Sequence, residues 1–229
     1  AHRGATGADP KTGDGAGMLI QIPHDFFVKV CHENKINLPA CGEYGTGLVF
    51  LPPNNKERKL CKDVFSKFIA EEGQILLGWR RVPVDDSDIG KAAKESEPVI
   101  EQVFIGKDKL IKGQLGFERK LYVIRKRIEN TIRASGLKQK SFFCITNLSS
   151  RTISYKGLLM PGQLENFFID LKDESMKSAL SLVHSRYSTN TFPTWALAHP
   201  YRMIAHNGEI NTLRGNINWM HAREMQFIS

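Results

Sequence analysis

Two long amphipathic helices limit what this chain can fold into more than any other feature of its sequence. The first is expected to start after Asn54, a good N-cap residue, and to end at Gly73. Its inward positions are Leu60, Cys61, Val64, Phe65, Phe68 and Ile69. The second is expected over residues 116–135, with an inward row of Leu121, Ile124, Ile128 and Ile132. Each apolar stripe has to be buried against another layer, so helices covering a sheet are predicted.

Short apolar runs between glycine-rich or proline-rich turns supply the strands of that sheet. Strands are predicted over residues 18–22, 44–51, 74–82, 98–105 and 180–184, and Pro23 can open a further helix with Phe26, Phe27, Val30 and Cys31 inward. Residues 141–148 and 151–156 alternate like the two strands of a hairpin around Ser149 and Ser150. This order predicts an α+β domain with a sizeable mixed or antiparallel sheet. The alternative, an open α/β sheet, requires more parallel crossovers.

Length and charge exclude several classes of protein. The 229 residues, 41% of them apolar, can bury a core as one large domain or at most two. No run approaches about eighteen apolar residues and the start has no signal-peptide pattern, so we expect a soluble protein with no membrane segment. The net charge is +8, and the basic residues are most concentrated over residues 119–127. There the basic residues fit the solvated face of the second helix better than a nucleic-acid site.

The four cysteines, Cys31, Cys41, Cys61 and Cys144, have neither C-x-x-C spacing nor the rhythm of metal ligands. We therefore expect reduced thiols, three of them packed in apolar surroundings, and no metal site in this chain. Free thiols favour a reducing compartment.

The segment over residues 206–219 is the hardest to explain by folding alone. An apolar run at 203–205 leads into Asn207 and Gly208, and helical spacing follows. A side-chain amide beside a glycine N–H offers two donors that can hold one developing negative oxygen. Asn-Gly is also the favoured pair of a two-residue hairpin. Asn211 suits a helix N-cap better than a returning strand, which favours the oxyanion interpretation.

Two other stretches stand out before any family is considered. The strand at 180–184 delivers a polar segment, Ser185 to Thr189, at its end, where sites are usually built. The opening at 12–17 is glycine-rich and must be a loop. Its G-x-G-x-G spacing precedes its strand, and neither Lys nor Ser/Thr follows Gly17, so a phosphate-binding loop is not favoured.

Four segments together carry a resemblance to a known family. They are His-Arg-Gly at 2–4, Thr-Gly-Asp-Gly-Ala-Gly at 12–17, the stretch from His-Ser-Arg-Tyr to Phe-Pro at 184–193, and the stretch from His-Asn-Gly-Glu to Gly-Asn at 206–216. Single pieces are unspecific. The ordered set, which spans nearly the whole chain, resembles the class II glutamine amidotransferase domain of the glutamate synthase large subunit. The resemblance implies one partial domain over residues 1–229 with an N-terminal-nucleophile fold, a four-layer αββα sandwich that is incomplete at both ends.

The resemblance also implies which residues act on glutamine. Asn207 and Gly208 match the oxyanion-hole pair. Arg186 matches the arginine that grips the glutamine carboxylate, and Thr189 matches a neighbouring substrate contact. Arg3 is placed near the nucleophile.

Other parts of the implied machinery fall outside the chain. The nucleophile of such enzymes is a cysteine at the mature N-terminus, whose own α-amino group is the base. It is expected upstream of Ala1, so this polypeptide alone is expected to be inactive. The acidic residue that binds the glutamine α-amino group is expected beyond Ser229. For His199, a lone histidine in Ala-His-Pro, a structural or exposed role is favoured.

The implied whole enzyme passes ammonia from glutamine to a synthase domain of the same chain, which carries FMN and an iron–sulfur cluster and converts 2-oxoglutarate to glutamate. No cofactor is expected in residues 1–229. The electron donor, a ferredoxin or a subunit using NADH or NADPH, stays open, and the expected location is the cytoplasm, or the plastid in a plant. The alternative is an amidotransferase-like domain without a nucleophile that binds or senses glutamine. The residues upstream of Ala1 would discriminate the two.

Overall fold

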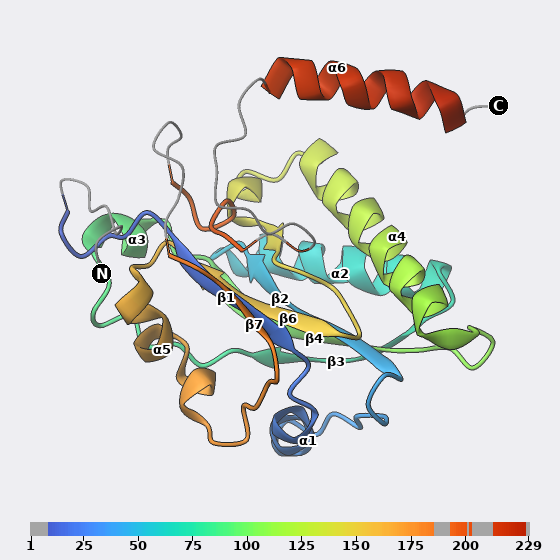
Figure 1. Ribbon diagram of the computed structural model, residues 1–229, viewed down its shortest axis with the longest axis horizontal. Coiled ribbons are helices and arrows are strands. Elements are labelled where there is room, and N and C mark those ends of the chain that lie inside the picture. The colour runs from blue at the N-terminus through green and yellow to red at the C-terminus, as the bar shows by residue number, and fades with distance from the viewer. Residues whose placement is uncertain (1–8, 186–192, 201, 203–212, 228–229) are drawn as a thin grey trace.

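The structure, a computed structural model, describes residues 9–185, 193–200, 202 and 213–227 (Figure 1). Its strands are β1 (Ala16–Gln21), β2 (Tyr44–Leu51), β3 (Ile75–Arg81), β4 (Val99–Gly106), β5 (Cys144–Ile145), β6 (Thr152–Gly157) and β7 (Ser181–His184). Its α-helices are α1 (His24–Glu33), α2 (Asn55–Glu71), α3 (Lys91–Glu95), α4 (Gly113–Ala134), α5 (Leu164–Phe167) and α6 (Leu213–Glu224). Within these described ranges, no helix is long and apolar enough to cross a membrane.

A four-stranded antiparallel sheet with the order β3-β4-β2-β5 forms the centre of the molecule. Every residue of β2 is buried, which requires cover on both faces of the sheet. Successive side chains point to opposite faces. Val49 and Leu51 accordingly pack in the core beneath α2 and α4, whereas Leu48 and Phe50 belong to a second core on the other face. The helices α2 and α4 lie side by side (Figure 1).

The two long amphipathic helices are confirmed, with one exception on α2. Asn54 caps α2 by accepting hydrogen bonds from the backbone N–H groups of Lys56 and Glu57, and Gly73 follows the helix at a φ of +71°. Leu60 is 52% exposed, so its predicted inward position is wrong. At 3.6 residues per turn it lies about 100° around the helix from the buried Cys61, beyond the edge of the apolar stripe.

The basic run on α4 is engaged in ion pairs instead of facing solvent alone. Arg127 pairs with Glu71 and Glu72 of α2, and Lys120 Nζ lies 3.0 Å from a Glu72 carboxylate oxygen. The Lys120 and Arg127 partners hold the pKa of Glu72 below its ordinary value. The apolar side of α4 faces the sheet as predicted, so this run helps to hold α4 against α2.

A smaller antiparallel sheet with the order β6-β1-β7 packs on the other face of the four-stranded sheet. Ile20 of β1 and Ile153 of β6 share a core with Leu48 and Phe50 of β2, and α1 adds Phe27 to it. The described layers are therefore helices, sheet and sheet, which confirms the predicted α+β class. All strand pairs in the described part of the chain are antiparallel, so the open α/β alternative is wrong.

The hairpin predicted around Ser149 and Ser150 is wrong. β5 pairs with β2 in one sheet, whereas β6 pairs with β1 in the other. Glu118 of α4 accepts hydrogen bonds from the Ser150 N–H at 2.6 Å and the Ser149 hydroxyl at 3.1 Å, which holds the connection as a corner between the sheets. Alternation in a sequence shows which side chains share a face but not which strand lies alongside.

A buried polar network crosses the interior between the two sheets. The Arg80 guanidinium of β3 donates to both carboxylate oxygens of Asp170, and the two side chains are 4% and 3% exposed. The Tyr155 hydroxyl of β6 donates to Asp170 at 3.0 Å, and Arg80 Nε donates to the Gln102 side-chain oxygen at 3.1 Å. Burial alone would lower the pKa of Arg80, but its hydrogen bonds to Asp170 and the charge of that carboxylate raise it. Arg80 therefore keeps its charge in this buried position.

The helix predicted near the end of the chain is confirmed from Leu213 onwards. Its apolar residues are not packed: Leu213 is 75% exposed and Trp219 is 78% exposed. Asn211, its predicted N-cap, lies outside the described residues.

Candidate functional site

The residues predicted to act on glutamine lie outside the part of the chain that the structure describes: Arg3, Arg186, Thr189, Asn207 and Gly208. The predicted strand at 203–205 lies outside it as well. The roles assigned to Arg3, Arg186, Thr189, Asn207 and Gly208 stay predictions. The structure does describe the framework that flanks them, which consists of the glycine-rich strand β1, the end of β7 just before Arg186, and the stretch 193–200.

One row of residues crosses all three strands of the smaller sheet. Gly17 of β1 pairs with Lys156 of β6 on one side and with His184 of β7 on the other. Residues paired in this way share one face of a sheet. Tyr155 belongs to the core between the sheets, so its neighbour Lys156 points away from that core. The Lys156–Gly17–His184 row therefore lies on the outer face of the sandwich.

The stretch 193–200, here named the strap, lies on this row. The ring of His199 stacks on the ring of His184, with centroids 4.4 Å apart and planes 23° apart. The His199 carbonyl oxygen lies against Gly17, where an added Cβ would come within 2.3 Å of it. Only glycine lets the strap approach the backbone of β1 so closely. His199 is buried, in agreement with the favoured structural role.

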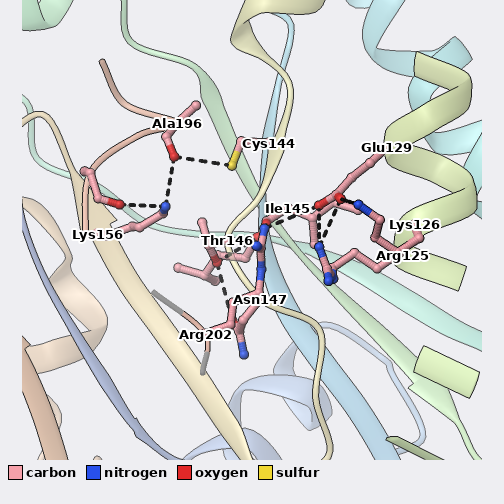
Figure 2. Close-up of polar contacts among 12 residues, drawn as sticks. Arg125, Lys126, Glu129, Cys144, Ile145, Thr146, Asn147, Lys156, Ala196 and Arg202 are labelled. Atoms are coloured by element: carbon pink, nitrogen blue, oxygen red, sulfur yellow. Dashed lines mark hydrogen bonds and ion pairs between the residues drawn. The ribbon is translucent and has the colours of Figure 1, made fainter. Parts of the chain in front are cut away.

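Lys156 holds the strap at the other end of the row (Figure 2). Its Nζ donates to the Ala196 carbonyl at 2.9 Å and to the Ala198 carbonyl at 2.7 Å, and the Cys144 thiol lies 3.8 Å from the same Ala196 oxygen. Burial lowers the pKa of Lys156, although the Cys144 thiol acts in the opposite direction. Among the described residues no carboxylate forms an ion pair with Lys156, so carbonyl dipoles alone hold this cation.

Trp195 provides an apolar anchor for the strap. Its ring is buried, meets the ring of Phe50 edge-on at 6.1 Å, and occupies space beside Gly157 that a Cβ would fill. Its indole N–H donates to the Ala93 carbonyl of α3 at 3.0 Å. The strap is therefore fixed in the core as well as on the outer face.

Arg202 fixes the chain just beyond the strap (Figure 2). It donates to the Ile145 carbonyl of β5 at 2.6 Å and lies 3.3 Å from Glu129 of α4. Glu129 also accepts from Arg125 at 2.9 Å. Burial lowers the pKa of Arg202, and the nearby Arg125 acts in the same direction. The strap thus continues into a polar cluster shared by β5 and α4.

The glycine-rich opening is explained by these close approaches. Gly15 has a φ of +124°, in the region that favours glycine, and its added Cβ would lie 3.3 Å from the Ala198 side chain. Gly15 and Gly17 together form the surface against which the strap packs. These contacts account for the two glycines without a phosphate ligand.

The cysteines in the described part of the chain are free thiols in packing positions, apart from the exposed Cys41. Burial raises the pKa of Cys31 to about 12 and that of Cys61 to about 11, and it also raises the pKa of Cys144. A nucleophilic thiol needs the opposite shift. The predicted packing in apolar surroundings is confirmed for Cys31 and Cys61, whereas Cys144 is half-buried and its thiol lies 3.8 Å from the Ala196 carbonyl oxygen.

Sequence reasoning missed Lys156, Trp195 and Arg202 as parts of this framework. Lys156 is one polar residue in a predicted strand, and only the pairing register brings it beside Gly17. The one available signal in the sequence was glycine at alternate positions around the start of β1. Glycine in a strand often marks the close approach of another backbone.

Comparison with known proteins places this framework in a family. The family described as "Glutamine amidotransferases class-II" matches residues 1–229, and the chain belongs to it. Its relatives include the glutamate synthase (NADPH) large chain of Bacillus subtilis, which is 56% identical over 228 residues that make up 100% of this chain and 15% of the relative. The corresponding large chain of Azospirillum brasilense is 45% identical, and the chloroplastic ferredoxin-dependent glutamate synthase of Oryza sativa is 43% identical, each over 97% of this chain and 14% of the relative. The chain thus spans about a seventh of the length of these relatives.

The metal chemistry that the resemblance implies finds no binding group in the described residues. No cluster of three or more His, Cys, Asp or Glu side chains there could hold a metal ion. These described residues therefore offer no ligand set for an iron–sulfur cluster.

Proposed function

We propose that this chain is the glutaminase part of a glutamate synthase. It hydrolyses the side-chain amide of glutamine to glutamate and ammonia, and the ammonia passes to a synthase domain of the same full-length chain for reductive amination of 2-oxoglutarate. The observation that carries the proposal is the strap on the Lys156–Gly17–His184 row. It joins the glycine motif, the strand that precedes Arg186 and the approach to Asn207. Family membership and the glutamate synthase relatives support the same assignment.

The proposed chemistry is acyl transfer through a thioester. A cysteine thiolate attacks the amide carbon, and Asn207 Nδ2 and the Gly208 N–H donate to the resulting oxyanion. The carbon–nitrogen bond breaks, ammonia leaves with a proton taken from the base, and water releases glutamate. The resemblance to the family implies that the nucleophile is its N-terminal cysteine, with its α-amino group as the base; the buried thiols of Cys31 and Cys61, whose pKa values burial raises, are poor candidates.

Substrate recognition in this proposal rests on a charged fork. Arg186 holds the glutamine α-carboxylate through two parallel hydrogen bonds, which a guanidinium can form and an ammonium cannot. Thr189 contacts the substrate beside it, and Arg3 lies near the nucleophile.

The remaining partners belong to the longer chain. They are the synthase domain with its FMN and iron–sulfur cluster, and an electron donor that is either ferredoxin or a subunit using NADH or NADPH. The proposed location is the cytoplasm, or the plastid in a plant, because the rice relative is a chloroplastic protein.

The proposal is tested by following the amide nitrogen in the full-length protein. Glutamine labelled with ¹⁵N in its side-chain amide is supplied with 2-oxoglutarate and a reductant. We expect one labelled and one unlabelled glutamate per turnover, because the amide nitrogen becomes the amino group of the new glutamate. Binding of glutamine with no release of amide nitrogen would instead identify a glutamine sensor and refute the proposal.

A further inference from the structure

Lys156 is a buried cation that the proposed reaction does not use. It lies on the outer face at one end of the Lys156–Gly17–His184 row, yet its side chain is almost inaccessible, with 6% of the residue exposed. A buried ammonium is costly unless it is paired or fully hydrogen-bonded. In the described part of the chain its polar partners are two carbonyls of one short segment, Ala196 and Ala198.

We propose that Lys156 is a positioning residue of the amidotransferase site, which holds the strap against the row through these two carbonyls. This inference rests on the proposed function. Lys156 touches neither glutamine nor the reacting atoms in this assignment. It acts through the chain that the strap connects.

The contact between Lys156 and the strap matters because of the two segments that the strap joins in the sequence. On one side the strap follows the segment that contains Arg186 and Thr189, and on the other it leads to Asn207 and Gly208. Thr189 lies four residues before the strap and Asn207 seven residues after it in the sequence, and each residue of chain spans at most about 3.6 Å, so the strap limits where both segments can reach. A displacement of about 1 Å at groups that orient a substrate can cost a hundredfold in rate.

The charge on Lys156 matters as well as its shape. Hydrogen bonds from an ammonium to carbonyl oxygens are shorter and roughly twice as strong as neutral ones. The Cys144 thiol reaches the same Ala196 oxygen only as a weak donor at 3.8 Å. The His184–His199 stack and the Gly17 contact hold the strap at His199 without a charged group. Lys156 is therefore the one described charged side chain that bonds the strap itself.

The test uses three variants of the full-length enzyme. Lys156→Met keeps a long unbranched side chain but removes the donors and the charge, and Lys156→Arg keeps both. Lys107→Met is the matched control, because Lys107 is also largely buried, with an 11% exposed side chain, and forms one ion pair with Glu43 far from the strap. Each variant is assayed with glutamine and, separately, with free ammonia, and amide hydrogen exchange is measured for the peptide covering the strap.

We expect Lys156→Met to lower kcat/KM for glutamine by about ten- to a hundredfold, with faster exchange in the strap and an ammonia-dependent rate within about twofold of the wild type. Lys156→Arg should recover most of the glutamine-dependent rate. Lys107→Met should leave both rates and the strap exchange nearly unchanged.

Three results overturn the assignment. Glutamine-dependent activity of Lys156→Met within about twofold of the wild type would show that the strap does not need this contact. An equal loss with glutamine and with ammonia would show that Lys156 only supports the fold. A wild-type enzyme with no glutamine-dependent activity would refute the proposed function, and the positioning role with it.

Discussion

The interior between the two sheets and the outer face of the smaller sheet each hold a buried cation, but the two cations are stabilised in different ways. In the interior, Arg80 is matched by the Asp170 carboxylate and by Gln102. On the outer face, Lys156 is held by the carbonyls of Ala196 and Ala198. The first set of partners comes from strand β4 and a short 3-10 helix, Ile169–Lys172, and the second comes from the strap alone.

The difference shows what each charge can control. An ion pair between two layers fixes how the layers sit on each other, and its loss affects the whole fold. A cation bound to the backbone of one strap fixes that strap alone. A substitution that breaks the interior pair should therefore change stability first, whereas loss of the Lys156 contact should change function with the fold intact.

The largest effect is expected where the interior pair is broken. Arg80→Met leaves the Asp170 carboxylate buried with no cationic partner, and breaking such a pair costs about 3–5 kcal/mol in the free energy of unfolding. Urea denaturation of the polypeptide, followed by tryptophan fluorescence, measures this loss. The double variant Arg80→Met with Asp170→Leu should regain most of it, because no unpaired charge remains. If Arg80→Met alone is as stable as the wild type, the Arg80–Asp170 pair does not stabilise the fold.

Loss of a proposed oxyanion donor should affect the rate and not the stability. In the full-length enzyme, Asn207→Ala removes one of the two proposed oxyanion donors, and we expect glutamine-dependent turnover to fall by roughly 10²- to 10³-fold. The ammonia-dependent rate should stay close to that of the wild type. If turnover with glutamine stays within about tenfold, the Asn-Gly turn is structural.

Gly17→Ala should disturb the strap from the β1 side and lower both stability and activity. The new Cβ would lie 2.3 Å from the His199 carbonyl oxygen, so the strap has to lift. Forced overpacking of this kind costs about 1–3 kcal/mol. The control is Gly136→Ala, where an added Cβ meets nothing within 4 Å. Thermal unfolding of both variants, together with glutamine-dependent activity, checks the prediction, and equal melting temperatures would contradict it.

The smallest effect concerns Glu97, a half-buried acid that belongs to neither set of contacts. Burial, reinforced by the charge of Asp86, raises the pKa of Glu97 from its ordinary value of 4.5 to about 7. The folded state therefore prefers the protonated form, and the free energy of unfolding falls as the pH rises from about 4.5 to about 7. Glu97→Gln should remove this slope and stabilise the protein at pH 8 by about 1 kcal/mol. Parallel slopes for variant and wild type in this pH range would show that Glu97 does not titrate as described.

Much of the fold could be predicted from local signals. The cap at Asn54, the stripe on α4 and the bounds of β2 are all written into short stretches of sequence, and the structure confirms them. The corner at Ser149 and Ser150 could not be predicted. Its shape depends on Glu118 from α4, which is close in space and distant in sequence.

The candidate site shows the same division. Motif resemblance points to Arg186 and Asn207, because their chemistry is carried by the residue types themselves. Lys156 carries no such signal. Its meaning comes from the register that pairs it with Gly17 and from the strap that returns over the sheet, and neither can be read from the neighbours of Lys156 in the sequence.

The contact between Gly17 and His199 also bears on how the molecule folds. It joins a strand near the beginning of the chain to a segment near its end, whereas α2 and α4 form from local contacts. Closing so long a loop is entropically costly, and contacts of this kind tend to form late. During synthesis the outer face of β1 must wait for the strap to emerge from the ribosome. A chain cut before the strap would leave the Lys156–Gly17–His184 row exposed to water. We therefore expect this uncovered face to be a binding surface for chaperones while the chain is being synthesised.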